Sequence, residues 1–310
     1  ERGAYGGLEA QGSPKAEQMN SEVIAGFAGV KAGDFVFFYV RNVGLHGLWK
    51  VTTEPFYDDT PIWPNLNQSF PYRACFVPIV RHFARPVALS DILDLRDKGQ
   101  IWTFDLATFV RKSHQPITAE EGKELIRLLL RNNPIYAPVV PVVNPYAPTR
   151  HNPLPIRLDG DGRGRLRYEG YLNAWFMRCF AHGELKDVVG DYSDFINHVP
   201  TSFNKVMDIF LTHVTEIDGL PILHKFSCME LKKGTVTLED LNQVVMYENW
   251  LVRKLARGDS EMVQSILVGS QFDTEVVEYR DKRKTIEEKA IRLIEYRADK
   301  AGATVRLQER

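Results

Sequence analysis

The sequence predicts an α/β protein in two parts, a small β-barrel with helices followed by a mixed α/β domain. Its 310 residues are about twice the usual size of one domain. Short β-branched and aromatic runs crowd the first third of the chain, whereas helix and strand patterns alternate in the second half. A proline-rich stretch separates the two patterns. We therefore expect domains over residues 20–135 and 161–310, joined by a linker over residues 136–160.

The composition is that of an ordinary globular protein. With 44% hydrophobic, 11% aromatic and 25% charged residues, the chain differs from disordered, collagen-like and coiled-coil sequences. Its 39 basic residues balance 40 acidic ones, and the net charge of -1 provides no overall positive field for a nucleic acid. Any contact with a nucleic acid therefore has to come from a local patch.

The cysteines indicate a reducing compartment, and the apolar runs predict no membrane-spanning segment. Cys75, Cys179 and Cys228 lie far apart in apolar surroundings, so neither a disulfide framework nor a cysteine zinc site is expected. No apolar run approaches the roughly 18 residues that span a bilayer, and no signal-peptide pattern opens the chain. The sequence thus predicts a cytoplasmic protein without a membrane partner.

Three strands are expected in the first domain. The first 20 residues lack a hydrophobic period and are interpreted as a loop. Dense β-branched and aromatic runs at 33–40 and 47–52 flank a glycine-containing turn, and residues 73–79 form a third run after an aromatic, proline-rich loop. Strands this short, with irregular connections, favour a small barrel.

Two helices are expected to close this domain. Ser90 can cap a helix over residues 91–96. Thr118, with Glu121 three residues later, matches a capping box for a helix over residues 122–130. The prolines that follow this helix predict an extended, semi-rigid connector.

The second domain alternates helices and strands. Arg163, Arg165 and Arg167 alternate along a predicted strand or extended arm, and a helix begins near Glu169. The other elements expected from the pattern are strands over 205–214, 222–232 and 263–268, a helix capped by Thr237, and a charged helix over 285–300. This order is typical of a mixed α/β domain.

Two carboxylates and a lysine at strand ends are the strongest sign of chemistry. Glu230 and Lys232 are two apart on one strand and share a face, and Asp208 reaches the same place if its strand is the neighbour. Converging carboxylates need a cation between them, and such ligands suit Mg²⁺, for which Mn²⁺ can substitute. A metal here could activate water while Lys232 neutralises charge on a phosphodiester. The alternative is that Asp208 and Glu230 are exposed strand-end residues.

Other polar residues accompany this pattern. Gln243 and Tyr247 are four apart and share one helix face, which could turn both toward the metal or the scissile phosphate. The alternatives are an interhelical hydrogen bond for Gln243 and a core position for Tyr247. Glu169 lies in the first turn of a helix, where the helix dipole favours any acidic residue.

A family resemblance rests on several of these segments. They are Tyr168-Glu169-Gly170-Tyr171-Leu172, the strand of Asp208, Met229-Glu230-Leu231-Lys232-Lys233-Gly234, the helix segment 240–247, and Ile266-Leu267-Val268-Gly269. Residues 165–280 thereby resemble the PD-(D/E)xK nucleases, and most of all the archaeal-type mismatch and branched-DNA endonucleases. The Pro-Asp dipeptide that names the superfamily is missing around Asp208, and the segment Ala174-Trp175-Phe176 is bulkier than the family pattern.

The resemblance implies a role for each matching residue. Asp208 and Glu230 would be the metal ligands, and Lys232 would be the catalytic lysine. Glu169 would be an acid carried by the helix, and Gln243 a further polar residue of the active site. The cofactor implied is Mg²⁺.

The first domain is rich in aromatic residues instead of acids. Trp49, Trp63, Tyr57, Phe38 and Tyr39 are candidates for stacking on a nucleic-acid base, although aromatic residues of a small barrel more commonly belong to its core. Trp63 and Tyr57 border a loop, 58–64, where a core cannot easily accommodate both. We expect Trp49 and Trp63 to be the walls of a base pocket.

Three further segments carry a second resemblance. They are the run 31–39, the run 47–56, and Phe70-Pro71-Tyr72-Arg73. On these, residues 30–133 resemble the EVE domain, a member of the PUA-like superfamily related to YTH domains. Such domains are similar in taking up a modified base in an aromatic pocket, so the resemblance implies a domain that reads modified bases.

Together these features predict a Mg²⁺-dependent endonuclease directed to modified DNA, such as DNA with methylated cytosine. Arg163, Arg165 and Arg167 are candidate phosphate contacts, and double-strand cleavage would favour a homodimer. The alternatives are a nuclease acting on RNA, a mismatch or branched-DNA endonuclease, and a non-catalytic nucleic-acid-binding protein.

Overall fold

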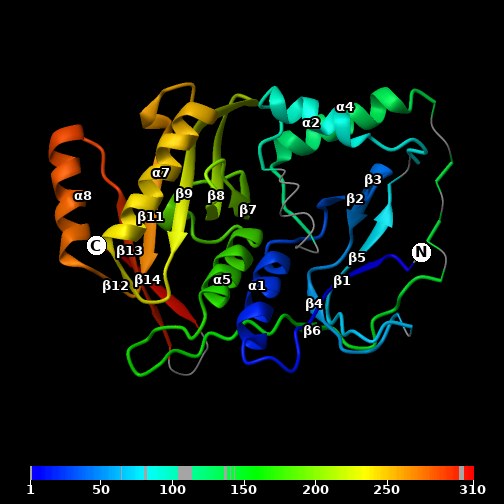
Figure 1. Ribbon diagram of the computed structural model, residues 1–310, viewed down its shortest axis with the longest axis horizontal. Coiled ribbons are helices and arrows are strands. Elements are labelled where there is room, and N and C mark those ends of the chain that lie inside the picture. The colour runs from blue at the N-terminus through cyan, green and yellow to red at the C-terminus, as the bar shows by residue number, and fades with distance from the viewer. Residues whose placement is uncertain are drawn as a thin grey trace. The chain divides into compact units, whose positions relative to one another are not determined.

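A computed structural model describes residues 2–63, 65–79, 82–103, 114–135, 138–139, 141–142, 144–299 and 304–310. The chain divides into two compact units, Glu1–Pro155 and Ile156–Arg310. Each unit has its own sheet and its own helices (Figure 1).

The first unit combines short strands with three described helices. In chain order its described elements are β1 (Ala4–Gly7), α1 (Ala16–Ala28), β2 (Phe35–Val40), β3 (Gly44–Val51), β4 (Phe56–Tyr57), β5 (Tyr72–Pro78), α2 (Leu89–Asp97), α4 (Ala119–Asn132) and β6 (Asn152–Pro153). The three strands and two helices expected from the sequence are all present in this set.

The sheet of the first unit is open. Its strand order is β2-β3-β5-β4-β6, with β1 paired to β5, and every pairing is antiparallel. Among the described strands no pairing joins β2 to β6, so the small barrel expected from the sequence does not close into a ring. Strands β4 and β6 contain two residues each, which is too short a ladder to continue the curvature into a closed ring.

The prediction that the first 20 residues form a loop is wrong. Strand β1 pairs with β5, and α1 begins at Ala16. The Tyr5 ring stacks on the Phe27 ring with centroids 5.7 Å apart. A Cβ on Gly7 would lie only 2.5 Å from the Phe27 ring, so glycine permits β1 to approach α1 closely. The glycines that hid the hydrophobic period are therefore required by packing.

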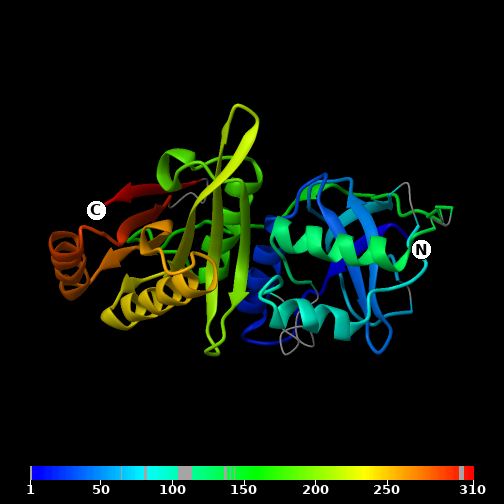
Figure 2. The same cartoon turned by 90° about the horizontal axis from the view of Figure 1, so that it is seen from above.

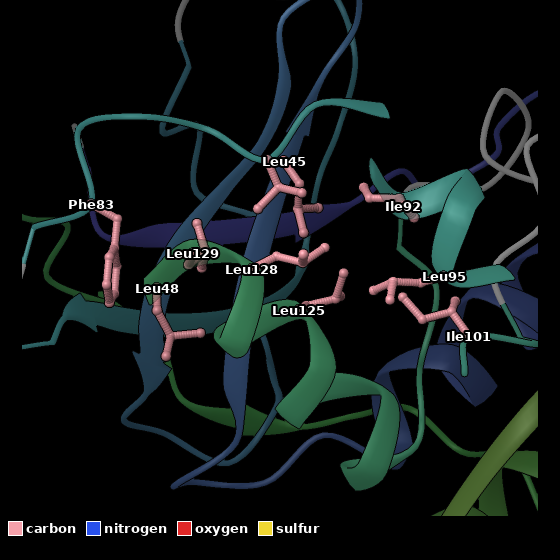
Figure 3. Packing of buried hydrophobic residues seen from close by; sticks show 10 residues of the cluster. Leu45, Leu48, Phe83, Ile92, Leu95, Ile101, Leu125, Leu128 and Leu129 are labelled. Carbon is pink, nitrogen blue, oxygen red and sulfur yellow. The ribbon is translucent and has the colours of Figure 1, made fainter. Parts of the chain in front are cut away.

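Helices α2 and α4 cover one side of this sheet through a shared apolar core. Figure 3 shows Leu45 and Leu48 of β3 facing Ile92 and Leu95 of α2 and Leu125 of α4. The predicted capping box of α4 is confirmed, since Thr118 and Glu121 each accept a hydrogen bond from the other's backbone N–H. The predicted Ser90 cap is wrong. Helix α2 begins at Leu89, and its N-cap, Ala88, has no side chain that can accept a hydrogen bond.

Part of the stretch expected to be a connector packs into the first unit. Strand β6 pairs with β4, and the Tyr146 hydroxyl donates to the buried Asp58 carboxylate. Thr149 N also donates to Asp58 at 3.2 Å. Residues 136, 137, 140 and 143 of this stretch lie outside the described residues.

The second unit is built on a six-stranded sheet. In chain order its described elements are α5 (Glu169–Ala181), α6 (Lys186–Val189), β7 (Asp194–Pro200), β8 (Val206–Ile217), β9 (Leu220–Leu231), β10 (Thr235–Val236), α7 (Leu238–Lys254), a 3-10 turn (Ser260–Met262), β11 (Val263–Gly269), β12 (Gln271–Phe272), α8 (Thr274–Glu287), β13 (Arg292–Ala298) and β14 (Val305–Glu309). The strand order is β14-β13-β11-β9-β8-β7.

In this mixed sheet the carboxyl ends of the parallel strands lie at the same edge as the start of β8. Strands β9, β11 and β13 are parallel, while β8 runs antiparallel to β9. Figure 1 shows α7 lying along β9 and β11, and Figure 2 shows the long β8–β9 hairpin from above. Ligands of open α/β sheets commonly bind at the carboxyl ends of parallel strands.

Two secondary-structure predictions for this unit are wrong. Residues 285–300 do not form one charged helix, because α8 ends at Glu287 and β13 follows. The charges of β13 have partners: Glu295 lies 2.9 Å from Arg297, and Arg292 lies 2.5 Å from Glu309. Of the strand or extended arm expected over residues 163–167, the strand is not found. Asp161 Oδ1 accepts from the backbone N–H groups of Arg163 and Arg165, which closes a turn.

Candidate active site and base pocket

Asp208, Glu230 and Lys232 lie together at one end of the second unit's sheet. Glu230 is near the carboxyl end of β9 and Lys232 follows this strand, while Asp208 stands near the start of the antiparallel β8. Lys232 Nζ donates to Glu230 Oε1 at 2.6 Å. Asp208 Oδ2 accepts from Leu231 N at 2.7 Å. The structure thus brings the three predicted residues to one point.

Two further predicted residues border this group. Gln243 Nε2 donates to Glu230 Oε1 at 2.7 Å and lies 2.7 Å from the Tyr247 hydroxyl. Tyr247 is buried, and its hydroxyl donates to Val206 O at 2.8 Å. Glu169, at the start of α5, accepts from Lys233 N at 3.2 Å. Gln243 therefore contacts the carboxylate group directly, whereas Tyr247 holds Gln243 in place.

Sequence reasoning missed three polar residues of this site. Asp240 Oδ1 lies 3.7 Å from Lys232 Nζ, although its other oxygen completes a capping box with Thr237. The buried Asn173 donates to Asp208 O at 3.3 Å and accepts from Asn197 at 2.9 Å. The only signal in the sequence was an asparagine, Asn173, among the apolar residues of a helix, because a buried amide needs hydrogen-bond partners.

Burial and repulsion favour the protonated forms of the Asp208 and Glu230 carboxyl groups. Burial raises the pKa of Glu230 to about 7, against the opposing charge of Lys232, and Glu169 and Asp240 raise this pKa further. Burial, together with repulsion from Glu230 and Glu169, holds the pKa of Asp208 well above its usual range. Burial alone would lower the pKa of Lys232, but the surrounding carboxylates outweigh it and raise the pKa. A cation would relieve this excess of negative charge.

The two carboxylates fit a hard divalent cation. Glu230 Oε2 is buried and has no hydrogen-bond partner, although Glu230 Oε1 has two. No group of three His, Cys, Asp or Glu side chains among the described residues is arranged to hold a metal ion. If a Mg²⁺ ion binds here, Asp208 and Glu230 would be its side-chain ligands, and water would supply the others.

Aromatic rings gather on the first unit's sheet, but some of those predicted to stack on a base pack against other protein side chains instead. Phe38 lies 4.8 Å from Trp49 and 5.2 Å from Phe76 between ring centroids, and all three side chains are half-buried. Tyr39 packs against the apolar core, as the alternative interpretation expects. Tyr57 pairs with Tyr72, with ring centroids 5.8 Å apart.

Trp63 borders a cavity of about 660 Å³ in the first unit. Its other walls include Phe76, Asn65 and Arg2. The Trp63 ring is held edge-on against Phe70, with centroids 5.5 Å apart. Arg2 Nε is buried without a hydrogen-bond partner, so a ligand with an acceptor atom could satisfy it. Aromatic walls beside a few polar groups are typical of a small-ligand site.

Comparison with known proteins identifies a domain that contributes part of this pocket, including Trp63, Asn65 and Phe76. The family model of the EVE domain matches residues 20–128. This segment is an EVE domain. It is PUA-like and indicates a nucleic-acid-binding role for the chain. Neither the curated proteins nor the solved structures contain a match to the chain. No described helix is long and apolar enough to cross a membrane.

Replacing Trp63 tests the pocket of the EVE domain. Trp63→Ala should weaken oligonucleotide binding by about 5–160-fold, because stacking contributes about 1–3 kcal/mol per base. Phe35→Ala is the matched control, since Phe35 is 54% exposed and does not line the cavity. Fluorescence anisotropy with oligonucleotides carrying or lacking 5-methylcytosine measures both variants. Equal affinities for the two variants would show that bases do not bind in this cavity.

Proposed function

We propose that the chain is an endonuclease in which the EVE domain binds modified DNA and the second unit hydrolyses phosphodiester bonds with Mg²⁺. Two observations together support hydrolysis: Asp208, Glu230 and Lys232 meet at one end of the sheet, and one buried oxygen of Glu230, Oε2, has no hydrogen-bond partner. A purely structural cluster would be expected to satisfy that oxygen, because a buried unpaired acceptor costs about 1–3 kcal/mol.

The chain's own residues have distinct tasks in this proposal. When bound, Mg²⁺ would stabilise negative charge on the phosphodiester and assist the attack of water. Asp208 and Glu230 would hold it, and Gln243 orients the Glu230 carboxylate by its hydrogen bond. The Lys232 ammonium is half-buried between Glu230 and Asp240, where it can neutralise charge that develops on the phosphoryl oxygens.

The EVE domain supplies selectivity in the same proposal. A base extruded into the cavity of Trp63 would stack on aromatic rings, and its polar edge would face Arg2 and Asn65. Joining a binding domain to a cutting domain raises the effective concentration of the cutter at a marked base. Cleavage of both strands requires two copies of the carboxylate site, so the proposed active form is a homodimer.

Substrate comparison tests the proposal. The full chain is incubated with methylated DNA, unmodified DNA, branched DNA or structured RNA, with Mg²⁺ or with a chelator. We expect Mg²⁺-dependent cleavage that is fastest for methylated DNA. Asp208→Asn should lower the cleavage rate on the order of a thousandfold and leave DNA binding measurable. Asp218→Asn, in the exposed hairpin turn, should leave the cleavage rate unchanged. Preferred cleavage of RNA or of branched DNA would replace the proposed substrate, and equal rates for both variants would refute the site.

A further inference from the structure

A second cavity lies in the second unit. Its volume is about 490 Å³, and three cationic side chains line it: Arg165, Arg167 and Lys233. The first two belong to the loop before α5, and Lys233 directly follows Lys232 of the candidate active site. Asp159 and Asp161 also line the cavity.

The walls of this cavity are fixed to each other. The buried Tyr296 accepts from Leu166 N at 3.1 Å and donates from its hydroxyl to Lys233 O at 2.6 Å. Lys233 Nζ donates to Arg167 O at 3.2 Å. Hydrogen bonds therefore join the loop before α5 to the segment that carries the active-site lysine.

Of the two acidic residues that line the cavity, Asp159 is exposed and Asp161 is largely occupied by its own turn. Asp161 accepts from the backbone of Arg163 and Arg165, at 2.8 and 3.0 Å, and these bonds lower its pKa. Its ion pair with the Arg165 side chain, at 3.0 Å, is partly exposed on both sides. Because ion pairs this exposed to water are weak, Arg165 can exchange Asp161 for a stronger anion.

Arg167 and Arg163 differ although both are exposed and lie on the same loop. The Arg167 guanidinium lies over the Tyr168 ring, 5.2 Å from its centroid, and Arg167 lines the cavity. Arg163 contributes a backbone hydrogen bond to the turn and does not line the cavity. The structure thus separates three arginines that the sequence groups together.

We propose that this cavity binds a phosphate group of the nucleic-acid strand, next to the phosphodiester held at Asp208 and Glu230. The acidic group alone repels a polyanion, so an adjacent cationic subsite is needed to bring the strand to it. Arg165, Arg167 and Lys233 supply that subsite, and Lys233 is one residue away from Lys232. The location of the phosphate relative to the cut rests on the proposed hydrolysis, but its binding does not.

Salt dependence of binding tests the subsite in the full-length chain. Affinity for a labelled DNA duplex is measured by anisotropy over a range of KCl concentrations, with a chelator present so that no cleavage occurs. Arg165→Gln, Arg167→Gln and Lys233→Gln should each weaken binding and reduce the slope of log affinity against log salt by about 1. The matched control Arg163→Gln should keep the slope of the unaltered protein. Unchanged slopes in the three variants, or the same change in Arg163→Gln, would overturn the proposal.

Two controls separate folding and hydrolysis from phosphate binding. Lys233→Arg keeps the charge and should keep the slope. If Lys233→Gln fails to fold, Lys233→Arg and Arg167→Gln together test whether the cavity binds phosphate. A chain that cleaves nothing but shows the expected slopes would refute the proposed hydrolysis and leave the subsite standing. If the chain cleaves DNA but the three variants have unchanged slopes, the phosphate subsite is refuted and the proposed hydrolysis stands.

Discussion

Glu230→Gln is expected to abolish Mg²⁺-dependent cleavage and, independently of cleavage, to flatten the pH dependence of stability. Burial raises the pKa of Glu230 to about 7 from an ordinary value near 4.5. Between these values the folded protein holds a proton that the unfolded chain has released. The stabilisation is therefore complete below pH 4.5 and is lost as the pH rises through 7, by on the order of 3 kcal/mol. Glutamine carries no charge at this position, so this loss should disappear.

Melting temperatures at pH 5.5 and pH 8, with and without Mg²⁺, check this expectation. The unaltered metal-free protein should lose more stability between these pH values than Glu230→Gln does, and Mg²⁺ should restore stability at pH 8 only where Glu230 is present. Glu278→Gln on the exposed side of α8 is the matched control and should behave like the unaltered protein. Equal Mg²⁺ stabilisation of Glu230→Gln would show that the ion binds elsewhere.

The residues that meet at the site could be predicted where the regular spacing of a strand or helix determines which way a side chain points. Glu230 and Lys232 share a strand face because side chains alternate, and Gln243 lies on the Tyr247 face because it is four residues earlier on a helix. Asp208 required the further assumption that β8 pairs with β9, which the register confirms. Local geometry and one correct pairing were enough for this part.

Residues with two tasks escaped prediction. Asp240 completes the capping box of α7, which explains its presence without any reference to Lys232. Lys233 looks like an ordinary surface lysine, and only its bond to Arg167 O shows that it lines a cavity. Contacts between residues 66 positions apart carry no local signal, so sequence patterns cannot reveal them.

The errors in the fold have similar causes. Strands β4 and β6 are too short to show a period, and the glycines of β1 interrupt it. Strand β13 was mistaken for helix because its charged residues suggested a solvated face, whereas they form ion pairs within the sheet. The capped helices α4 and α7 were predicted correctly because a capping box is a local feature.

Asp58→Asn should strongly destabilise the first unit. Asp58 is fully buried and lies 3.4 Å from Arg73 Nη1, and the Arg73 side chain is 2% exposed. Burial alone would raise the pKa of Asp58, but hydrogen bonds from Tyr146 and Thr60 outweigh it and hold this pKa well below its usual range. Removing one charge leaves the Arg73 guanidinium buried without compensation, which costs about 3–5 kcal/mol.

The neighbouring aspartate shows whether burial is the reason for this effect. Asp59 pairs with Arg150 at 3.3 Å, but both side chains are more than half exposed, so Asp59→Asn should cost less than about 1 kcal/mol. Hydrogen exchange of the full chain measures both variants, with peptides from residues 169–298 as the internal reference. In Asp58→Asn, protection should fall in β4, β5 and residues 144–153, since Arg73, Tyr146 and Thr149 meet at this carboxylate. If Asp58→Asn and Asp59→Asn lose equal protection, the buried pair does not hold residues 144–153 against the EVE domain, and the short β4–β6 ladder must do so instead.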